Sequence, residues 1–243
     1  MTAPFITVLL DRSGSMASIL APTIEAFNGY LTGQQRDNPD AVFTLMLFDN
    51  ISVDILHRAE PIAKVKLLDG LTYEPRGTTP LIDACVKAIK ATETAAPKDA
   101  PVVVVIQTDG HENASIEYKQ SYLNQLVKDK TAEGWLFVFL GANMDAFDVA
   151  RGLGFERQHT MSYDGKSSVM AFDSLNRSTL SYTRVGGGAQ GQSVAAFTAE
   201  DRLAADPDQR LAPGDPLPPN PLPNPPAPLS DESLKPVVDE IKI

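Results

Sequence analysis

Three short apolar runs, each free of charged residues, constrain the fold of this chain more than any other feature. They span Phe5 to Leu10, Val102 to Ile106 and Trp135 to Leu140. Runs of this length without polar alternation are typical of strands that are buried on both faces of a sheet. The stretches between them are amphipathic with a helical period. This alternation predicts an α/β fold in three layers, with a mostly parallel sheet covered by helices on both faces.

Both edges of the predicted sheet can be assigned from shorter segments. Val42 to Phe48 and Ile51 to Leu56 flank Asp49-Asn50, a tight-turn sequence. Two strands joined in this way form an antiparallel hairpin, so we expect one antiparallel edge strand. A short strand near Gln158 to Met161 is expected to close the other edge.

The clearest helix follows Thr79, which is expected to be its N-cap, with Pro80 at the first helical position. Apolar residues recur there on one face, namely Leu81, Ala84, Cys85, Ala88 and Ile89. Pro22 is compatible with another helix only if it lies near the first turn. Asn113 or Ser115 is expected to cap the helix that follows Asp109. The other helices are expected over Ala17 to Leu31, Ser115 to Lys130, Asp145 to Arg151 and Lys166 to Tyr182.

Charge and cysteine content exclude several classes of function. The formal net charge is −10 with no run of Lys and Arg, so nucleic acid is an unfavourable direct partner. Cys85 is the only cysteine, which excludes an intrachain disulfide, and its place on an apolar helix face predicts core packing. No stretch is long enough to cross a membrane and no secretory signal is visible, so we expect a cytoplasmic protein without membrane contact.

The composition changes at Gly186-Gly187-Gly188. Residues 1–185 are expected to form the folded domain, and residues 186–243 a disordered, Gly- and Pro-rich arm. Prolines are dense from Pro207 to Pro228, which predicts an extended linker in preference to a ligand for an aromatic groove, because no basic residue lies within the run. The segment Leu234 to Ile243 is either a short partner-binding motif or a frayed end.

Oxygen-bearing side chains gather in three separate segments of the chain. Asp11, Ser13 and Ser15 directly follow the first apolar run, Thr78-Thr79 precedes a helix, and Asp109 follows the second run. Any one of these segments alone is ordinary turn and cap chemistry. Ligand sites of such sheets lie outside the carboxyl ends of the strands, so the segments are expected to converge there. An oxygen-only cluster suits a hard divalent cation such as Mg²⁺.

The order Asp-x-Ser-x-Ser, then Thr, then Asp resembles the von Willebrand factor A (VWA) domain with an intact metal-ion-dependent adhesion site. The resemblance covers roughly residues 1–183 and implies a three-layer, Rossmann-like fold. It implies that Ser13 and Ser15 coordinate Mg²⁺ or Mn²⁺ through their hydroxyls and that Asp11 and Asp109 act largely through bound waters. Thr79 would join the ligands when a partner is bound, with Thr78 as the alternative.

This resemblance implies a metal-dependent protein-interaction module, without enzymatic activity, that docks an acidic side chain of a partner on the metal. Two alternatives belong to other classes. In a Mg²⁺-dependent phosphohydrolase Asp11 would be the nucleophile, but enzymes of that kind place a second Asp where this chain has Ser13. In a structural subunit the metal site would be vestigial. A serine hydrolase is disfavoured because neither serine lies in a Gly-x-Ser-x-Gly turn. His111, near the site, is expected at its rim.

Overall fold

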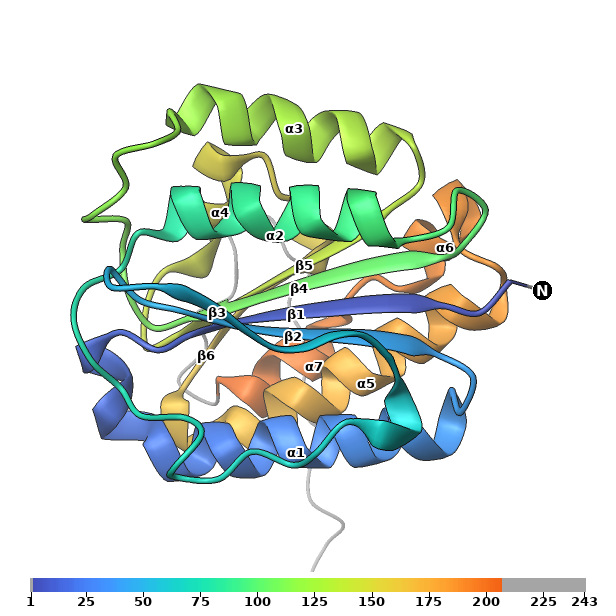
Figure 1. Cartoon of the computed structure of the whole chain (residues 1–243). Coiled ribbons are helices and arrows are strands. Elements are labelled where there is room, and N and C mark those ends of the chain that lie inside the picture. The colour runs from blue at the N-terminus through green and yellow to red at the C-terminus, as the bar shows by residue number, and fades with distance from the viewer. Residues whose placement is uncertain (1, 207–243) are drawn as a thin grey trace, which may run out of the picture.

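The strands of the computed structural model form a single sheet in the order β3-β2-β1-β4-β5-β6 (Figure 1). The structure describes residues 2–206. The strands are β1 Phe5–Asp11, β2 Val42–Phe48, β3 Val53–Pro61, β4 Val102–Thr108, β5 Leu136–Ala142 and β6 Thr160–Tyr163. Only β3 pairs antiparallel, with β2, and the other neighbours are parallel. The predicted sheet and its antiparallel edge strand are therefore confirmed.

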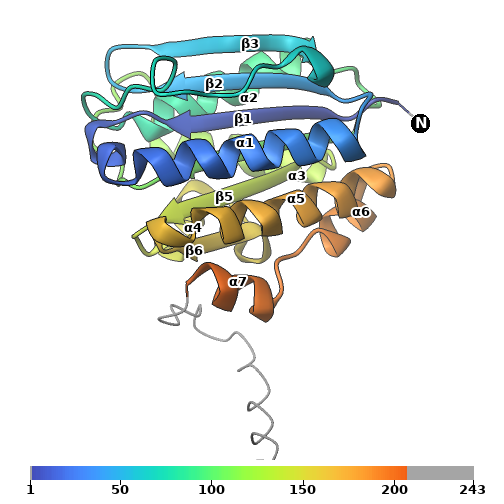
Figure 2. The same cartoon turned by 90° about the horizontal axis from the view of Figure 1, so that it is seen from below.

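Helices cover both faces of this sheet. They are α1 Leu20–Asp37, α2 Leu81–Ala95, α3 Gln120–Ala132, α4 Ala146–Leu153, α5 Ser168–Arg184, α6 Gly188–Val194 and α7 Ala199–Ala205, with short 3₁₀ turns at η1 Gly14–Ile19, η2 Ile62–Lys64, η3 Arg157–His159 and η4 Gly165–Ser167. Figures 1 and 2 show α2, α3 and α4 on one face and α1, α5 and α7 on the other. Pro22 lies in the first turn of α1, as the sequence requires.

Two apolar cores, one on each face, explain why the central strands lack polar alternation. Side chains of β1 alternate between them, with Ile6, Val8 and Leu10 in one core and Phe5 and Leu9 in the other. Every residue of β1, β4 and β5 is buried. Burial on both faces favours apolar residues at successive positions, which is the pattern in the sequence.

The expected cap of α2 is wrong. Helix α2 begins at Leu81, and its N-cap residue is Pro80. The N-cap makes no side-chain hydrogen bond to the helix. Thr79 instead pairs with the loop after β4, since its backbone N donates to Oδ1 of Asn113 at 2.9 Å and its carbonyl O accepts from the backbone N of Asn113 at 3.2 Å. The Thr79 hydroxyl is therefore available for the site at the end of the sheet.

The expected cap of α3 is also wrong. Helix α3 begins at Gln120 after Lys119, so neither Asn113 nor Ser115 caps it. Ser115 Oγ accepts from the backbone N of Asp83 at 3.0 Å, in the first turn of α2. Asn113 and Ser115 therefore fix this loop to Thr79 and to the start of α2, through long-range bonds that local sequence does not reveal.

The folded region extends beyond the predicted boundary. Helices α6 and α7 lie within the segment expected to be a disordered arm, and Ala195, Phe197 and Ala205 are buried in the core beside α1 and α5. Arg202 is buried and donates to the carbonyl O atoms of Phe197 and Thr160. The expectation is therefore wrong for these helices. The proline-rich stretch and the C-terminal segment lie outside the described residues.

None of the helices within residues 2–206 combines the length and the apolar character needed to span a bilayer.

Candidate metal centre

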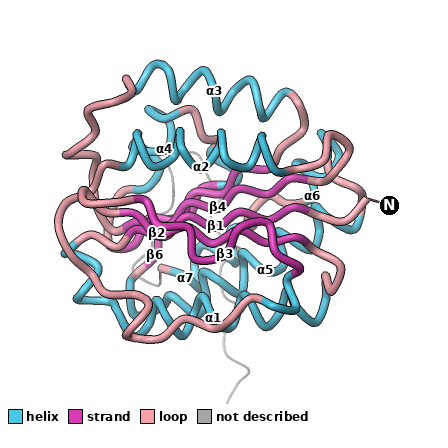
Figure 3. Tube along the Cα trace, viewed as in Figure 1, coloured by secondary structure: helices cyan, strands magenta, loops and turns pink. Residues whose placement is uncertain are grey.

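The sheet order places the ends of β1 and β4 side by side. Strand β1 lies between β2 and β4, so the chain order reverses at this point of the sheet. Asp11 is the last residue of β1, and Leu10 pairs with Gln107 of β4, which brings Thr108 next to Asp11. Figure 3 shows, in pink, that the loops after β1 and β4 gather at the same end of the sheet. Ligand sites of open α/β sheets lie at such points.

Asp11 is the most deeply buried carboxylate of the site. It is 0% exposed; its Oδ1 accepts from the backbone N of Ser13 at 2.7 Å, and its Oδ2 accepts from Oγ1 of Thr108 at 2.5 Å. The Tyr73 hydroxyl donates to its carbonyl O. Burial raises the pKa of Asp11 to about 6, although the hydrogen bonds from Thr108 and Ser13 oppose the rise. The ionised carboxylate therefore lacks a compensating positive charge, which a cation would supply.

Ser13, Ser15 and Asp109 form a chain of oxygens that leads from this carboxylate to the surface. Ser13 Oγ lies 3.1 Å from Ser15 Oγ, which donates to Oδ1 of Asp109 at 2.6 Å. Ser13 is buried, Asp109 half-buried and Ser15 exposed. Burial raises the pKa of Asp109, while the bond from Ser15 lowers it in part. The oxygens therefore converge at an open mouth.

The spacing and type of these oxygens fit a small divalent cation. With Mg–O bonds of about 2.0–2.1 Å, two ligand oxygens in neighbouring octahedral positions lie about 2.9 Å apart. The two observed separations, 3.1 and 2.6 Å, bracket that value. Among the described residues, no group of three or more His, Cys, Asp or Glu could hold a metal ion. A metal site here therefore has to draw on the hydroxyls.

Thr79 is the threonine that joins this cluster. It is 2% exposed, and a Cβ atom added at Gly110 would lie 3.1 Å from Thr79 Oγ1 and 3.8 Å from Ser15 Oγ. The two hydroxyls therefore flank the same glycine, whose lack of a side chain keeps the space between them open. Thr78 is exposed, and its backbone N donates to Oδ1 of Asn50 at 2.9 Å. This geometry favours Thr79 over Thr78.

Backbone contacts hold residues 76–79, the threonine loop, against residues 12–15, the serine loop. The backbone N of Gly14 donates to the carbonyl O of Gly77 at 3.1 Å, and the backbone N of Arg76 donates to the carbonyl O of Arg12 at 2.8 Å. Gly77 has φ +69°, and a Cβ there would lie 1.9 Å from Oδ1 of Asn50. A glycine is therefore required at this turn for both steric reasons.

An ion-pair cluster that includes Arg12, the residue before Ser13, was not predicted from the sequence. Oδ2 of Asp49 accepts from Nε of Arg12 at 2.9 Å and from Nε of Arg76 at 2.8 Å. Burial alone would raise the pKa of Asp49, but the hydrogen bonds from Arg76, Ser52 and Ile51 and the charge of Arg12 together hold it below its ordinary value. The cluster ties the serine loop, the β2–β3 turn and the threonine loop together.

Thr108 is a further member that the sequence analysis missed, and its signal was a polar residue at the end of an otherwise apolar strand. Its hydroxyl donates to Asp11 and accepts from the backbone N of Gly110 at 3.1 Å. His111 is exposed. Thr108 therefore fixes the position of the buried carboxylate relative to the loop that carries Asp109.

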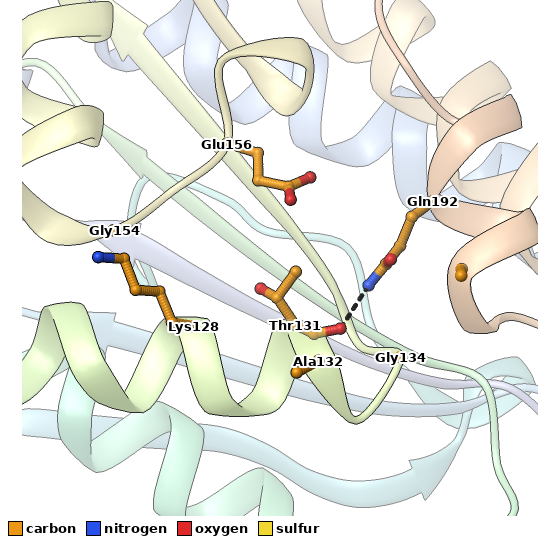
Figure 4. A pocket seen from close by; sticks show the side chains of 8 residues that line it. Lys128, Thr131, Ala132, Gly134, Gly154, Glu156 and Gln192 are labelled. Carbon is orange, nitrogen blue, oxygen red and sulfur yellow. Dashed lines mark hydrogen bonds between the residues drawn. The ribbon is translucent and has the colours of Figure 1, made fainter.

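A cavity of about 470 Å³ lies away from this cluster, near the amino ends of β5 and β6 (Figure 4). Its wall includes Gly134 and Gln192, and Nε2 of Gln192 donates to the carbonyl O atoms of Thr131 and Trp135 at 2.8 Å each. These bonds attach α6 to the end of α3. None of the predicted site residues lines this cavity.

The fold defined by these elements is that of VWA domains. The chain is similar to a von Willebrand factor type A protein from Catenulispora acidiphila, with 13% identity, a TM-score of 0.54, and coverage of 74% of this chain and 43% of that chain. It is similar to the vWF domain of the type V pili tip protein Mfa5 from Porphyromonas gingivalis, with 9% identity, a TM-score of 0.54, and coverage of 74% and 96%.

A third similar structure is the pilus adhesin SpaC from Lactobacillus rhamnosus GG, in its open conformation. Its identity is 12%, its TM-score 0.58, and coverage is 74% of this chain and 30% of SpaC. The chain thus spans less than half the length of the Catenulispora protein and of SpaC. No protein-family model and no curated protein matches the sequence. The similarity at these identities concerns the fold.

Proposed function

We propose that this chain is a divalent-metal-dependent interaction module that acts by binding and not by catalysis. Mg²⁺ or Mn²⁺ would be held by the hydroxyls of Ser13, Ser15 and Thr79, with Asp11 and Asp109 acting largely through water. The bound ion would supply a positive centre that accepts a carboxylate from a protein partner. The observation that carries the proposal is the convergence of hydroxyl and carboxylate oxygens at an open mouth above a buried, uncompensated aspartate.

The aspartates and the hydroxyls would have different roles at the metal. Asp11 and Asp109 supply negative charge that attracts the cation, whereas the neutral hydroxyls leave much of its positive field for an incoming anion. The formal net charge of −10 would repel an acidic partner from most of the surface. A local cation at the mouth would overcome that repulsion at one point and so select where the partner docks.

The fold and the sequence support the remaining features of the proposal. SpaC, which is similar in fold, is a pilus adhesin, which is consistent with a binding role for a domain of this shape. The cytoplasmic location that we propose rests on the sequence alone.

The two alternatives receive less support from the geometry. A phosphohydrolase needs a nucleophile that can reach phosphorus, but Asp11 is 0% exposed and both of its carboxylate oxygens accept hydrogen bonds within the protein. A vestigial site would be expected to lack some of its donors, yet the oxygen donors at the mouth face one another.

Calorimetric titration of the chelator-treated protein with Mg²⁺ and Mn²⁺ tests the metal site. Binding should be lost in Asp11→Ala and Asp109→Ala and kept in Asp99→Ala, since Asp99 is exposed and precedes β4 at the opposite end of the sheet. Thermal melts should show that the metal stabilises the wild type because it binds only the folded chain. An unchanged titration in both site variants would refute the ligand assignment.

The interaction role is tested by capture of partners from a cell lysate with and without EDTA. Capture should need the metal, and Thr79→Ala should weaken capture more than it weakens metal affinity. With Mg²⁺ present, the protein should not hydrolyse phosphomonoesters above background. Turnover that disappears in Asp11→Asn would establish the phosphohydrolase instead.

A further inference from the structure

The loop between β4 and α3 is held firmly although it has no helix or strand. Asp83, in the first turn of α2, accepts from the backbone N atoms of Ile116, Glu117 and Tyr118 at 2.9, 3.1 and 2.9 Å. Asp83 is 4% exposed. A buried carboxylate that accepts three successive N–H groups fixes the path of that backbone.

The same loop is fixed a second time by Glu112. Its Oε1 accepts from the backbone N atoms of Ala114 and Ser115 at 2.8 and 2.7 Å, and its Oε2 accepts from the backbone N of Ile82 at 2.8 Å. The loop therefore leaves Asp109 and is bound to the start of α2 along its length. Its exposed side chains are presented from a set position.

Ile116 is one of those side chains and is 91% exposed. Ile51, on the β2–β3 turn, is 68% exposed, and its backbone N donates to Oδ1 of Asp49 at 2.7 Å. Both isoleucines line a cavity of about 170 Å³, together with Pro80. Single exposed apolar residues are ordinary, but two that face one cavity from two fixed loops form a candidate contact surface.

This cavity, the isoleucine groove, lies beside the candidate metal centre. Pro80 lines the groove and directly follows Thr79, whose hydroxyl belongs to the oxygen cluster. Figure 1 shows the β2–β3 turn and the loop after β4 at the same end of the sheet as η1, which carries Ser15. Thr79 and Pro80 are consecutive residues and neighbouring Cα atoms are about 3.8 Å apart, so one extended partner segment can reach both positions.

The charged side chains that line the groove already have partners, and Asp49 among them accepts from Arg12 and Arg76. Lys87 forms an ion pair with Glu117 at 2.5 Å, and Asp83 is engaged by backbone N–H groups. An apolar side chain can enter without separating either set. At about 30 Å³ per water molecule in the liquid, the cavity of about 170 Å³ corresponds to about six waters, which leaves room for a branched aliphatic side chain.

We infer that the partner segment recognised by this chain carries an Asp or Glu for the metal and, within about two residues of it, a branched aliphatic side chain for the isoleucine groove. This inference rests on the proposed function and names the kind of partner it serves. The metal position supplies the attraction for the acid, and Ile51 and Ile116 discriminate among acidic segments by their neighbouring side chain.

Display of short random peptides, selected on the full chain in Mg²⁺, tests the inference. The enriched peptides should pair an acid with Ile, Leu or Val. A synthetic peptide of that sequence should bind Ile116→Ser at least about tenfold more weakly, as expected for loss of burial of one aliphatic side chain. Val194→Ser is the matched control, because Val194 is a 48% exposed aliphatic residue on α6, at the opposite end of the sheet (Figure 1), and should bind like the wild type.

Other outcomes separate the inference from the proposed function. Enrichment of acidic peptides with no aliphatic neighbour, or equal affinity in Ile116→Ser, overturns the groove and leaves the metal-docking proposal intact. Peptides whose binding ignores EDTA and Thr79→Ala overturn the proposed function itself. A dimer in solution that Ile116→Ser dissociates would assign the groove to a second copy of the chain, and this also overturns the inference.

Discussion

Asp11→Asn should change how the stability of the metal-free protein depends on pH. Burial raises the pKa of Asp11 from 3.8 to about 6 in the folded protein. Since one pKa unit corresponds to about 1.36 kcal/mol, the ionised carboxylate lowers the free energy of unfolding by about 3 kcal/mol relative to its protonated form. The folded protein binds this proton more tightly than the unfolded chain, so stability rises as the pH falls through about 6 and is fully gained only below the unfolded pKa.

Between pH 7.5 and pH 5 this group alone should add about 1.4 kcal/mol to the free energy of unfolding, from the two pKa values and the linkage relation. The asparagine variant lacks that contribution. Its fold should persist, because the asparagine amide can donate to Oγ1 of Thr108, whose own proton can turn to the carbonyl O of Gly110, 3.2 Å away. Acids with lowered pKa, such as Asp49, oppose the trend equally in both proteins and cancel in the comparison.

Urea denaturation in EDTA at both pH values measures the difference between wild type and variant. In saturating Mg²⁺ the wild type should no longer gain stability from Asp11 on acidification, because the cation stabilises the ionised carboxylate. Equal pH responses of wild type and variant in EDTA, within about 0.5 kcal/mol, would refute the account of Asp11 as an uncompensated buried charge.

Three further predictions concern a loop anchor, the C-terminal helices and the buried cysteine. Asp83→Ala should lower the free energy of unfolding by about 2 kcal/mol in urea denaturation, because loop N–H groups lose a charged acceptor, whereas Lys87→Ala, with its part-exposed ion pair, should change it by less than about 1 kcal/mol. Truncation after Val185 should destabilise the domain by more than about 3 kcal/mol, since it removes the buried Phe197 with α6 and α7. Burial raises the pKa of the Cys85 thiol, so a thiol reagent should label it only in denaturant.

The layers of the fold could be predicted because they depend on local periodicity. The apolar runs at Phe5 to Leu10 and Val102 to Ile106 correspond to β1 and β4, and the helix expected over Asp145 to Arg151 corresponds to α4. The end of the domain could not be predicted in this way. Helices α6 and α7 are short and rich in small and polar residues, and their place depends on a few buried contacts such as Phe197.

The candidate site was only partly visible from the sequence for a related reason. Asp11 directly follows one apolar run and Asp109 lies three residues after the other, so the parallel sheet order implies that they meet. Asn113 bonds to Thr79, just before α2, and Ser115 bonds to Asp83 within α2, so tertiary contacts set their partners and local cap preferences point to the wrong helix. The link from Arg12 to Asp49 joins segments far apart in the chain and has no local signature.

The contrast between rigid and open parts explains how one site can serve both ion and partner. Asp11 accepts hydrogen bonds from Ser13 and Thr108, so its carboxylate has a fixed position before any ligand arrives. The side-chain oxygens of Ser15 and Asp109 bond to one another, and Ser15 also to Ser13; Ser15 is exposed and Asp109 half-buried. An arriving cation therefore has to replace only these bonds near the surface. Because the adjoining loop is fixed to α2, a partner that reaches the ion meets a surface that is already ordered, and little of its binding energy is spent in shaping it.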